Sequence, residues 1–87
     1  MKNAIALLLS LVCAPAFASA NCTKYPKAEW MPEADAKAKI EAMGYKIGKF
    51  KIDGNCYEIY GHNQDGKKAE VYFDAKTLAV VKAEIEK

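Results

Sequence analysis

The chain has 87 residues, with 13 lysines, no arginine and 11 acidic residues, which gives a formal net charge of +2. A chain of this length has room for one small domain at most. Near neutrality, and without the guanidinium group that recognises phosphate and guanine in bidentate fashion, it has no basic field suited to nucleic acid. We therefore expect no nucleic-acid partner.

The first twenty residues have the pattern of an export signal. Lys2 provides a positive start, an apolar run broken by one serine covers residues 4–12, and Ala18-Ser19-Ala20 has the small residues that signal peptidase cuts after. The apolar run is shorter than the roughly 20 residues that a helix needs to span a bilayer. We predict a signal peptide over residues 1–20, cleaved after Ala20, and no membrane anchor after cleavage.

Cleavage would leave two cysteines, Cys22 and Cys56, in a chain with a net charge of +1. Exported proteins meet an oxidising compartment, where an even number of cysteines indicates a disulfide. A redox pair or a metal site is a poorer explanation, because the sequence has no C-x-x-C motif and one histidine. The prediction is a Cys22–Cys56 disulfide that stabilises a periplasmic or secreted protein by roughly 3 to 4 kcal/mol.

One helix is expected, from Pro32 to Met43. Pro32 suits a first helical position, acidic residues in the first turn complement the helix dipole, and Gly44 is typical of a C-terminal cap. The apolar stripe that should face the core consists of Ala36, Ile40 and Met43.

From residue 45 the apolar period changes to two, which predicts strands. Turn signals at Gly54-Asn55, at Asp65-Gly66 and over residues 74–77 divide this part of the chain, and connections so short force antiparallel neighbours. Gly48 interrupts the first strand and indicates a bulge. The expected strands are Tyr45–Asp53, Cys56–Gly61, Lys67–Phe73 and Val80–Glu86.

The alternation of side chains gives the predicted sheet a buried face and a polar face. We predict an α+β domain over residues 21–87, with one helix packed on a four-stranded antiparallel meander sheet and one disulfide. The side chains expected to point inward are Tyr57, Ile59, Ala69, Val71, Phe73, Val81, Ala83 and Ile85.

Three stretches, in this order along the chain, carry a resemblance to a known family. They are Glu29-Trp30-Met31-Pro32-Glu33 with Gly44-Tyr45-Lys46-Ile47, then Gly54-Asn55-Cys56-Tyr57-Glu58-Ile59, then Asp65-Gly66-Lys67-Lys68-Ala69-Glu70-Val71-Tyr72-Phe73-Asp74. From about Cys22 to Val81 the chain resembles a small secreted PepSY-domain protein. It departs from the family pattern at Pro32, near which a capping Ser or Thr is common, and at Leu78, where a glycine usually follows the threonine.

The family name comes from peptidase propeptides, in which related domains restrain a secreted peptidase or assist its folding. The resemblance implies a non-catalytic binding module, a peptidase inhibitor or a propeptide-like modulator. Its partner would be an exported peptidase or another envelope polypeptide. An enzyme is not expected, since the sequence after residue 20 has no serine, no arginine and one histidine.

Two surfaces are candidates for contact with such a partner. Tyr60 and Tyr72 lie on the polar face of the predicted sheet, and exposed tyrosine is typical of contact residues. The alternative is that this face is simply solvated, because opposite charges on neighbouring strands also stabilise a polar face that binds nothing. The other candidate is an edge strand that pairs with an extended peptide, although the charged residues of Val80–Glu86 are expected to protect that strand.

His62 is the basis of an alternative function, a periplasmic sensor or carrier of a small ligand or metal. Residues 63–66 are similar to the start of a calcium loop, but the position that should hold the closing Glu is Asp74. We therefore predict a solvated histidine beside a hairpin turn, with no cofactor and no metal.

Overall fold

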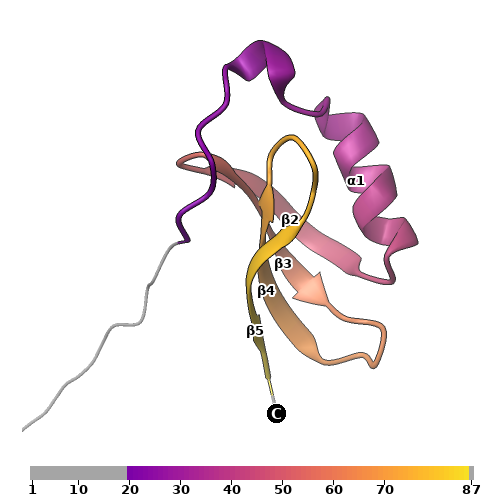
Figure 1. Cartoon of the computed structure of the whole chain (residues 1–87). Coiled ribbons are helices and arrows are strands. Elements are labelled where there is room, and N and C mark those ends of the chain that lie inside the picture. Colours follow the sequence, from indigo (N-terminus) through magenta and orange to yellow (C-terminus); the bar gives the residue numbers. More distant parts are fainter. Residues whose placement is uncertain (1–19, 87) are drawn as a thin grey trace, which may run out of the picture.

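A computed structural model of the chain describes residues 20–86 (Figure 1). The predicted leader lies outside the described residues, apart from Ala20. No helix within residues 20–86 is long and apolar enough to cross a membrane. The elements in chain order are η2 (Lys27–Glu29), α1 (Glu33–Ala42), β2 (Lys46–Asp53), β3 (Cys56–His62), β4 (Lys68–Asp74) and β5 (Val80–Ile85).

The four strands form one sheet in the order β2-β3-β4-β5, with every neighbouring pair antiparallel. Gly54 and Gly66 have φ values of +61° and +78° in the two hairpin turns, a conformation that glycine adopts without the cost of a Cβ. The register of β2 shifts between Ile47 and Lys49, which confirms the bulge predicted at Gly48. The predicted fold class is confirmed, and each strand boundary lies within one residue of its expected position.

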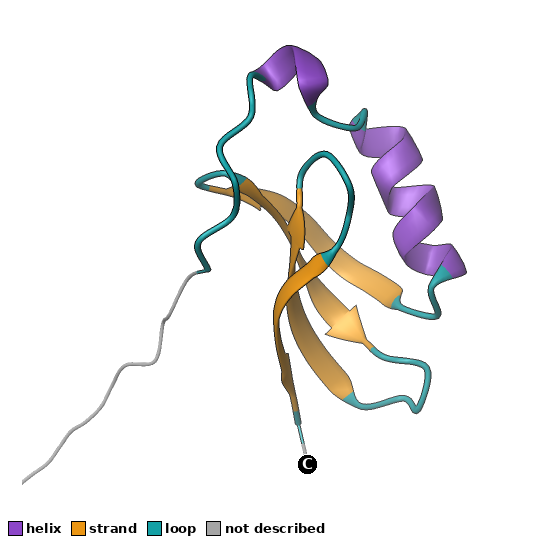
Figure 2. Ribbon diagram, viewed as in Figure 1, coloured by secondary structure: helices purple, strands orange, loops and turns teal. Residues whose placement is uncertain are grey.

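The helix α1 lies along one face of the sheet, as Figure 2 shows. It begins after Pro32 and is followed by Gly44, whose φ of +105° turns the chain into β2. Ala36 and Ile40 are fully buried, as predicted. The prediction for Met43 is wrong: it is the C-cap residue, where the chain leaves the helix, and its side chain is exposed.

The core between helix and sheet is small and rich in aromatic rings. Phe73, Val71 and Ile59 of the two central strands are fully buried beneath Ile40. Rings meet edge to face around them, with 5.3 Å between the centroids of Trp30 and Tyr57 and 5.9 Å between those of Tyr45 and Phe73. Such contacts add about 0.5 to 1.5 kcal/mol each beyond the burial of area.

A disulfide ties the arm before η2 to the start of β3. Cys22 and Cys56 are bonded, with 5.3 Å between their Cα atoms, which confirms the prediction. The Tyr25 hydroxyl donates to Asp74 Oδ2 at 3.1 Å, and Trp30 Nε1 donates to the Tyr25 carbonyl at 3.0 Å. The bonded arm is therefore part of the folded domain and holds Trp30 against the core.

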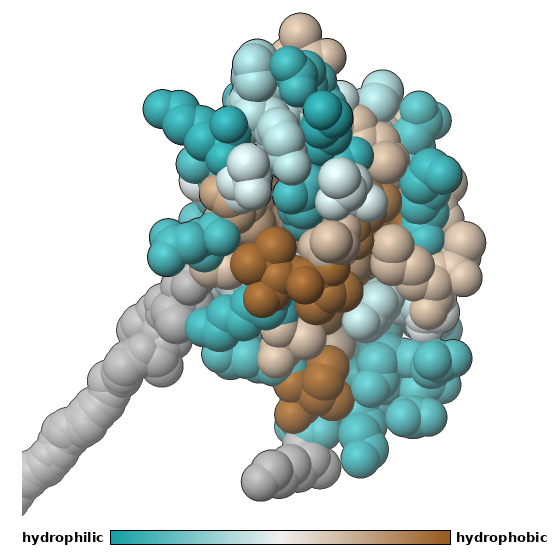
Figure 3. All heavy atoms as spheres, in the orientation of Figure 1, coloured by the Kyte–Doolittle hydropathy of each residue, from teal (hydrophilic) through white to brown (hydrophobic). Residues whose placement is uncertain are grey.

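The strand β5 departs from the predicted burial. Val81, Ala83 and Ile85 were expected to be buried, but all three are exposed. A helix about 10 Å wide covers roughly two strands spaced 4.8 Å apart, and α1 lies against β2, away from β5. Figure 3 shows hydrophobic residues gathered at the surface over β5.

Candidate functional site

The outer face of the sheet, opposite α1, brings two acids and two tyrosines together. The register of β3 and β4 sets Glu58 beside Tyr72 and Tyr60 beside Glu70. We call these four residues the acid–tyrosine cluster. Side chains alternate along each strand, so all four project from the same face, away from the apolar core.

The cluster is only partly exposed. Tyr60 is 42% exposed, whereas Tyr72 is 3% and Glu58 is 1% exposed. The expectation that both tyrosines are exposed is correct for Tyr60 and wrong for Tyr72. Tyr72 lies on a central strand, and its hydroxyl donates to Glu70 Oε2 at 2.9 Å, which holds the ring down among its neighbours.

The pKa values of the two carboxyl groups of the cluster are shifted in opposite directions. Burial raises the pKa of Glu58, and a hydrogen bond with Glu70 raises it further. The same hydrogen bond lowers the pKa of Glu70. Glu58 therefore keeps its proton to higher pH than Glu70 does, as expected of two adjacent carboxyl groups, which cannot both ionise cheaply.

Burial and the neighbouring carboxyl groups raise the pKa of both phenols. A hydrogen bond with Glu58, followed by burial, raises the pKa of Tyr60 to about 12. Burial and the hydrogen bond to Glu70 raise the pKa of Tyr72. The Lys51 ammonium lies 5.8 Å from the centroid of the Tyr60 ring. Tyr60 is thus an exposed aromatic with a lysine ammonium over its ring and two carboxyl groups beside it.

The raised pKa of Glu58 predicts that the stability of the protein depends on pH. Because the pKa of Glu58 is raised by folding, its contribution is complete below the unfolded pKa and is lost as pH rises through the folded pKa. Glu58→Gln keeps a hydrogen-bond donor toward Glu70 without a titrating proton. We expect the wild-type protein to lose stability relative to Glu58→Gln as pH rises above about 4.5, the ordinary pKa of a glutamate. Urea unfolding at a series of pH values measures the difference.

The control for this comparison is Glu41→Gln, which removes one carboxyl from an exposed position on α1. Its stability profile should run parallel to that of the wild-type protein across the same pH range. If the Glu58→Gln profile also ran parallel to the wild-type profile, folding would not raise the pKa of Glu58.

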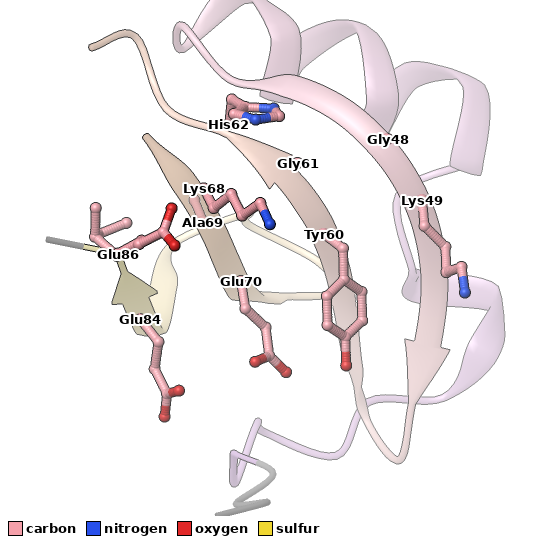
Figure 4. Close-up of a pocket in the computed structure, with 11 residues that line it drawn as sticks. Gly48, Lys49, Tyr60, Gly61, His62, Lys68, Ala69, Glu70, Glu84 and Glu86 are labelled. Carbon is pink, nitrogen blue, oxygen red and sulfur yellow. The ribbon is translucent and has the colours of Figure 1, made fainter. Parts of the chain in front are cut away.

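A shallow groove of about 590 Å³ lies beside the cluster on the outer face. Gly48 and Gly61 contribute no side chain to it, so that part of its floor is backbone. Figure 4 shows Tyr60, Glu70 and Glu84 pointing the same way from three neighbouring strands. An exposed aromatic beside a shallow groove with charges around it suits contact with a polypeptide.

His62 is exposed at the end of β3. The Asn63 side-chain Oδ1 accepts hydrogen bonds from the backbone N–H groups of Asp65 at 2.9 Å and Lys67 at 3.0 Å, which confirms the hairpin turn predicted here. Within residues 20–86, no group of three or more His, Cys, Asp or Glu residues is arranged to hold a metal ion.

Sequence reasoning placed Tyr60 and Tyr72 on the outer face but missed the two acids beside them and the burial of Glu58. The signal was available in the hairpin between β3 and β4. Once His62 is set opposite Lys68, counting back along the strands puts Glu58 beside Tyr72 and Tyr60 beside Glu70. The burial of Glu58 could not be predicted from the register, because it depends on how the tyrosine rings lie over the sheet.

The fold defines a class of protein: a small disulfide-bonded α+β domain with one helix on a four-stranded antiparallel sheet. The family model described as peptidase propeptide and YPEB domain matches residues 2–84, so the chain belongs to the PepSY family. The family connects the chain with peptidases as a propeptide-like module, and the disulfide fits an oxidising compartment. No curated protein and no solved structure matches the chain significantly.

Proposed function

We propose that this protein is an exported, non-catalytic binding module that acts on an exported peptidase as an inhibitor or a propeptide-like modulator. Membership of the PepSY family supports the connection to peptidases. The observation that carries the proposal is Tyr60, a large exposed side chain on the outer sheet face with the Lys51 ammonium over its ring. The proposal includes cleavage after Ala20 and a periplasmic or secreted location.

Tyr60 has the properties of an interface anchor. Its phenol is neutral at physiological pH, and hydrogen bonding with Glu58 and burial raise its pKa further, to about 12. Tyrosine has only two side-chain torsions, so it offers a large contact area at a low entropic cost on binding. Lys49 and Glu70 flank it along the groove and supply the charged rim that protein interfaces have around such an anchor.

The proposal predicts that Tyr60→Ala weakens binding to the target peptidase at least tenfold, as truncation of an interface hot spot does. The target is first sought by crosslinking in the native envelope and by testing the purified protein against exported peptidases. Binding and inhibition are then measured for the wild-type protein and the variant.

The matched control is Ile52→Ala. Ile52 is a large residue with nearly the same exposure as Tyr60, but it belongs to the helix-side face near the end of β2. We expect this variant to bind as the wild-type protein does. Equal binding by Tyr60→Ala would remove the outer face from the interface, and failure to find any bound or inhibited peptidase would contradict the proposed function itself.

A further inference from the structure

The strand β5 forms one edge of the described sheet and carries an apolar strip. Val80, Val81 and Ile85 are 49%, 42% and 40% exposed. They lie beyond the part of the sheet that α1 covers. An edge that exposes both backbone hydrogen-bonding groups and apolar side chains is a template for pairing with another strand.

The hydrogen-bonding direction of β5 alternates from residue to residue. The Glu86 backbone N–H donates to the Lys68 carbonyl at 2.9 Å, so Glu86 faces β4. In an antiparallel ladder the backbone groups of alternate residues point to opposite sides. Those of Ala83 and Ile85 therefore point away from β4, toward the open edge.

The side chains of β5 suit pairing with an identical strand. In an antiparallel pair related by a two-fold axis at Ala83, Lys82 of each copy stands opposite Glu84 of the other. On the helix side, Ile85 stands opposite Val81, where the register of β5 on β4 shifts, so the regular part of the pair runs from Lys82 to Glu84. The central pair brings the outward backbone groups of the two Ala83 residues together, so the register satisfies hydrogen bonding and charge at once.

Neighbouring registers are unfavourable. An axis at Lys82 sets the two Lys82 side chains opposite each other, and an axis at Glu84 does the same to the two Glu84 side chains; like charges directly opposite are destabilising. Within one chain, Lys82 Nζ already lies 3.4 Å from Glu84 Oε2. Self-pairing at Ala83 would extend this contact into a ring of four alternating charges.

We propose that two copies of this chain associate through β5, as an antiparallel pair centred on Ala83 that joins the two sheets into one. Lys82 and Glu84 would still disfavour pairing with an arbitrary peptide, because only a strand with the same order of charges can match them. The two-fold axis is perpendicular to the joined sheet, so both copies present Tyr60 on the same outer face. The dimer adds to the proposed function and does not depend on it.

Charge exchange tests the register. The mass of the protein, purified from an exporting host, is measured by analytical ultracentrifugation over a wide range of concentration. We expect a monomer–dimer equilibrium that Lys82→Glu and Glu84→Lys each weaken about tenfold, since each variant turns two attractive pairs into repulsive ones. The double variant, Lys82→Glu with Glu84→Lys, should restore the wild-type dissociation constant within about threefold, because the charges match again.

A backbone variant separates the edge from other surfaces. Ala83→Pro removes an N–H that points away from β4, so the fold should persist while the dimer is lost. Circular dichroism and urea unfolding verify the fold of every variant. A protein that stays monomeric at all concentrations overturns the proposal, as does a dimer that tolerates Ala83→Pro or one that the double variant does not restore.

Discussion

Replacing both Cys22 and Cys56 with alanine is expected to lower the free energy of unfolding by about 3 to 4 kcal/mol. The bond joins residues 34 apart, and without it the unfolded chain regains the freedom of that loop. A domain with so small a core has little stability to spare, so the loss should be a large fraction of the total. Urea unfolding of the oxidised protein and of the double alanine variant measures it.

Reduction of the wild-type protein with dithiothreitol is the control, since it opens the loop without removing the two sulfur atoms from their packed positions. The reduced protein and the alanine variant should differ by less than either differs from the oxidised protein. A loss below about 1 kcal/mol in both would mean that the contacts of Tyr25 and Trp30 alone hold the arm.

The helix and the central strands could be predicted because their sequence patterns are local. Alternation places Ile59 and Val71 in the core, since β3 and β4 are the central strands of the sheet and both side chains are fully buried. Glycines at the turns fix the hairpins, because positive φ values are required there. The disulfide followed from counting the cysteines left after the predicted cleavage.

The exposure of β5 could not be predicted in the same way. Val81 and Ile85 follow the same alternation as Val71, yet Val71 is buried and they are exposed. The pattern identifies the face on which a side chain lies but not how far one short helix reaches across that face. How far the helix reaches depends on the packing of α1 near β2. That packing is a tertiary contact and cannot be read from any one segment of the sequence.

At Leu78, burial of the side chain outweighs the backbone preference of a non-glycine residue for negative φ. The family pattern has a glycine where Leu78 stands, and the structure gives Leu78 a φ of +64°, in the left-handed region. That conformation costs a non-glycine residue about 1 to 2 kcal/mol, whereas burying a leucine side chain contributes about 1.5 to 3 kcal/mol. Leu78 is buried in the core cluster, so the turn survives without its glycine.

Gly61→Ala is expected to lower the free energy of unfolding by about 2 to 3 kcal/mol, the range for overpacking against groups that cannot yield. A Cβ at Gly61 would collide with the carbonyl oxygen of Lys46 and would lie 3.0 Å from the backbone nitrogen of Gly48. Both are backbone atoms of β2, so no side-chain rotation relieves the contact. The strand must move at its bulge, and the ladder between β2 and β3 opens there.

Gly66→Ala is the matched control, because a Cβ at Gly66 meets no atom within 4 Å. It should cost only the roughly 1 kcal/mol of a left-handed alanine. Hydrogen exchange distinguishes the two variants: Gly61→Ala should lose protection in β2 near the bulge while β4 retains it. If Gly61→Ala were as stable as Gly66→Ala, β2 would have to shift at little cost, and the backbone floor of the groove beside Tyr60 would be a movable surface.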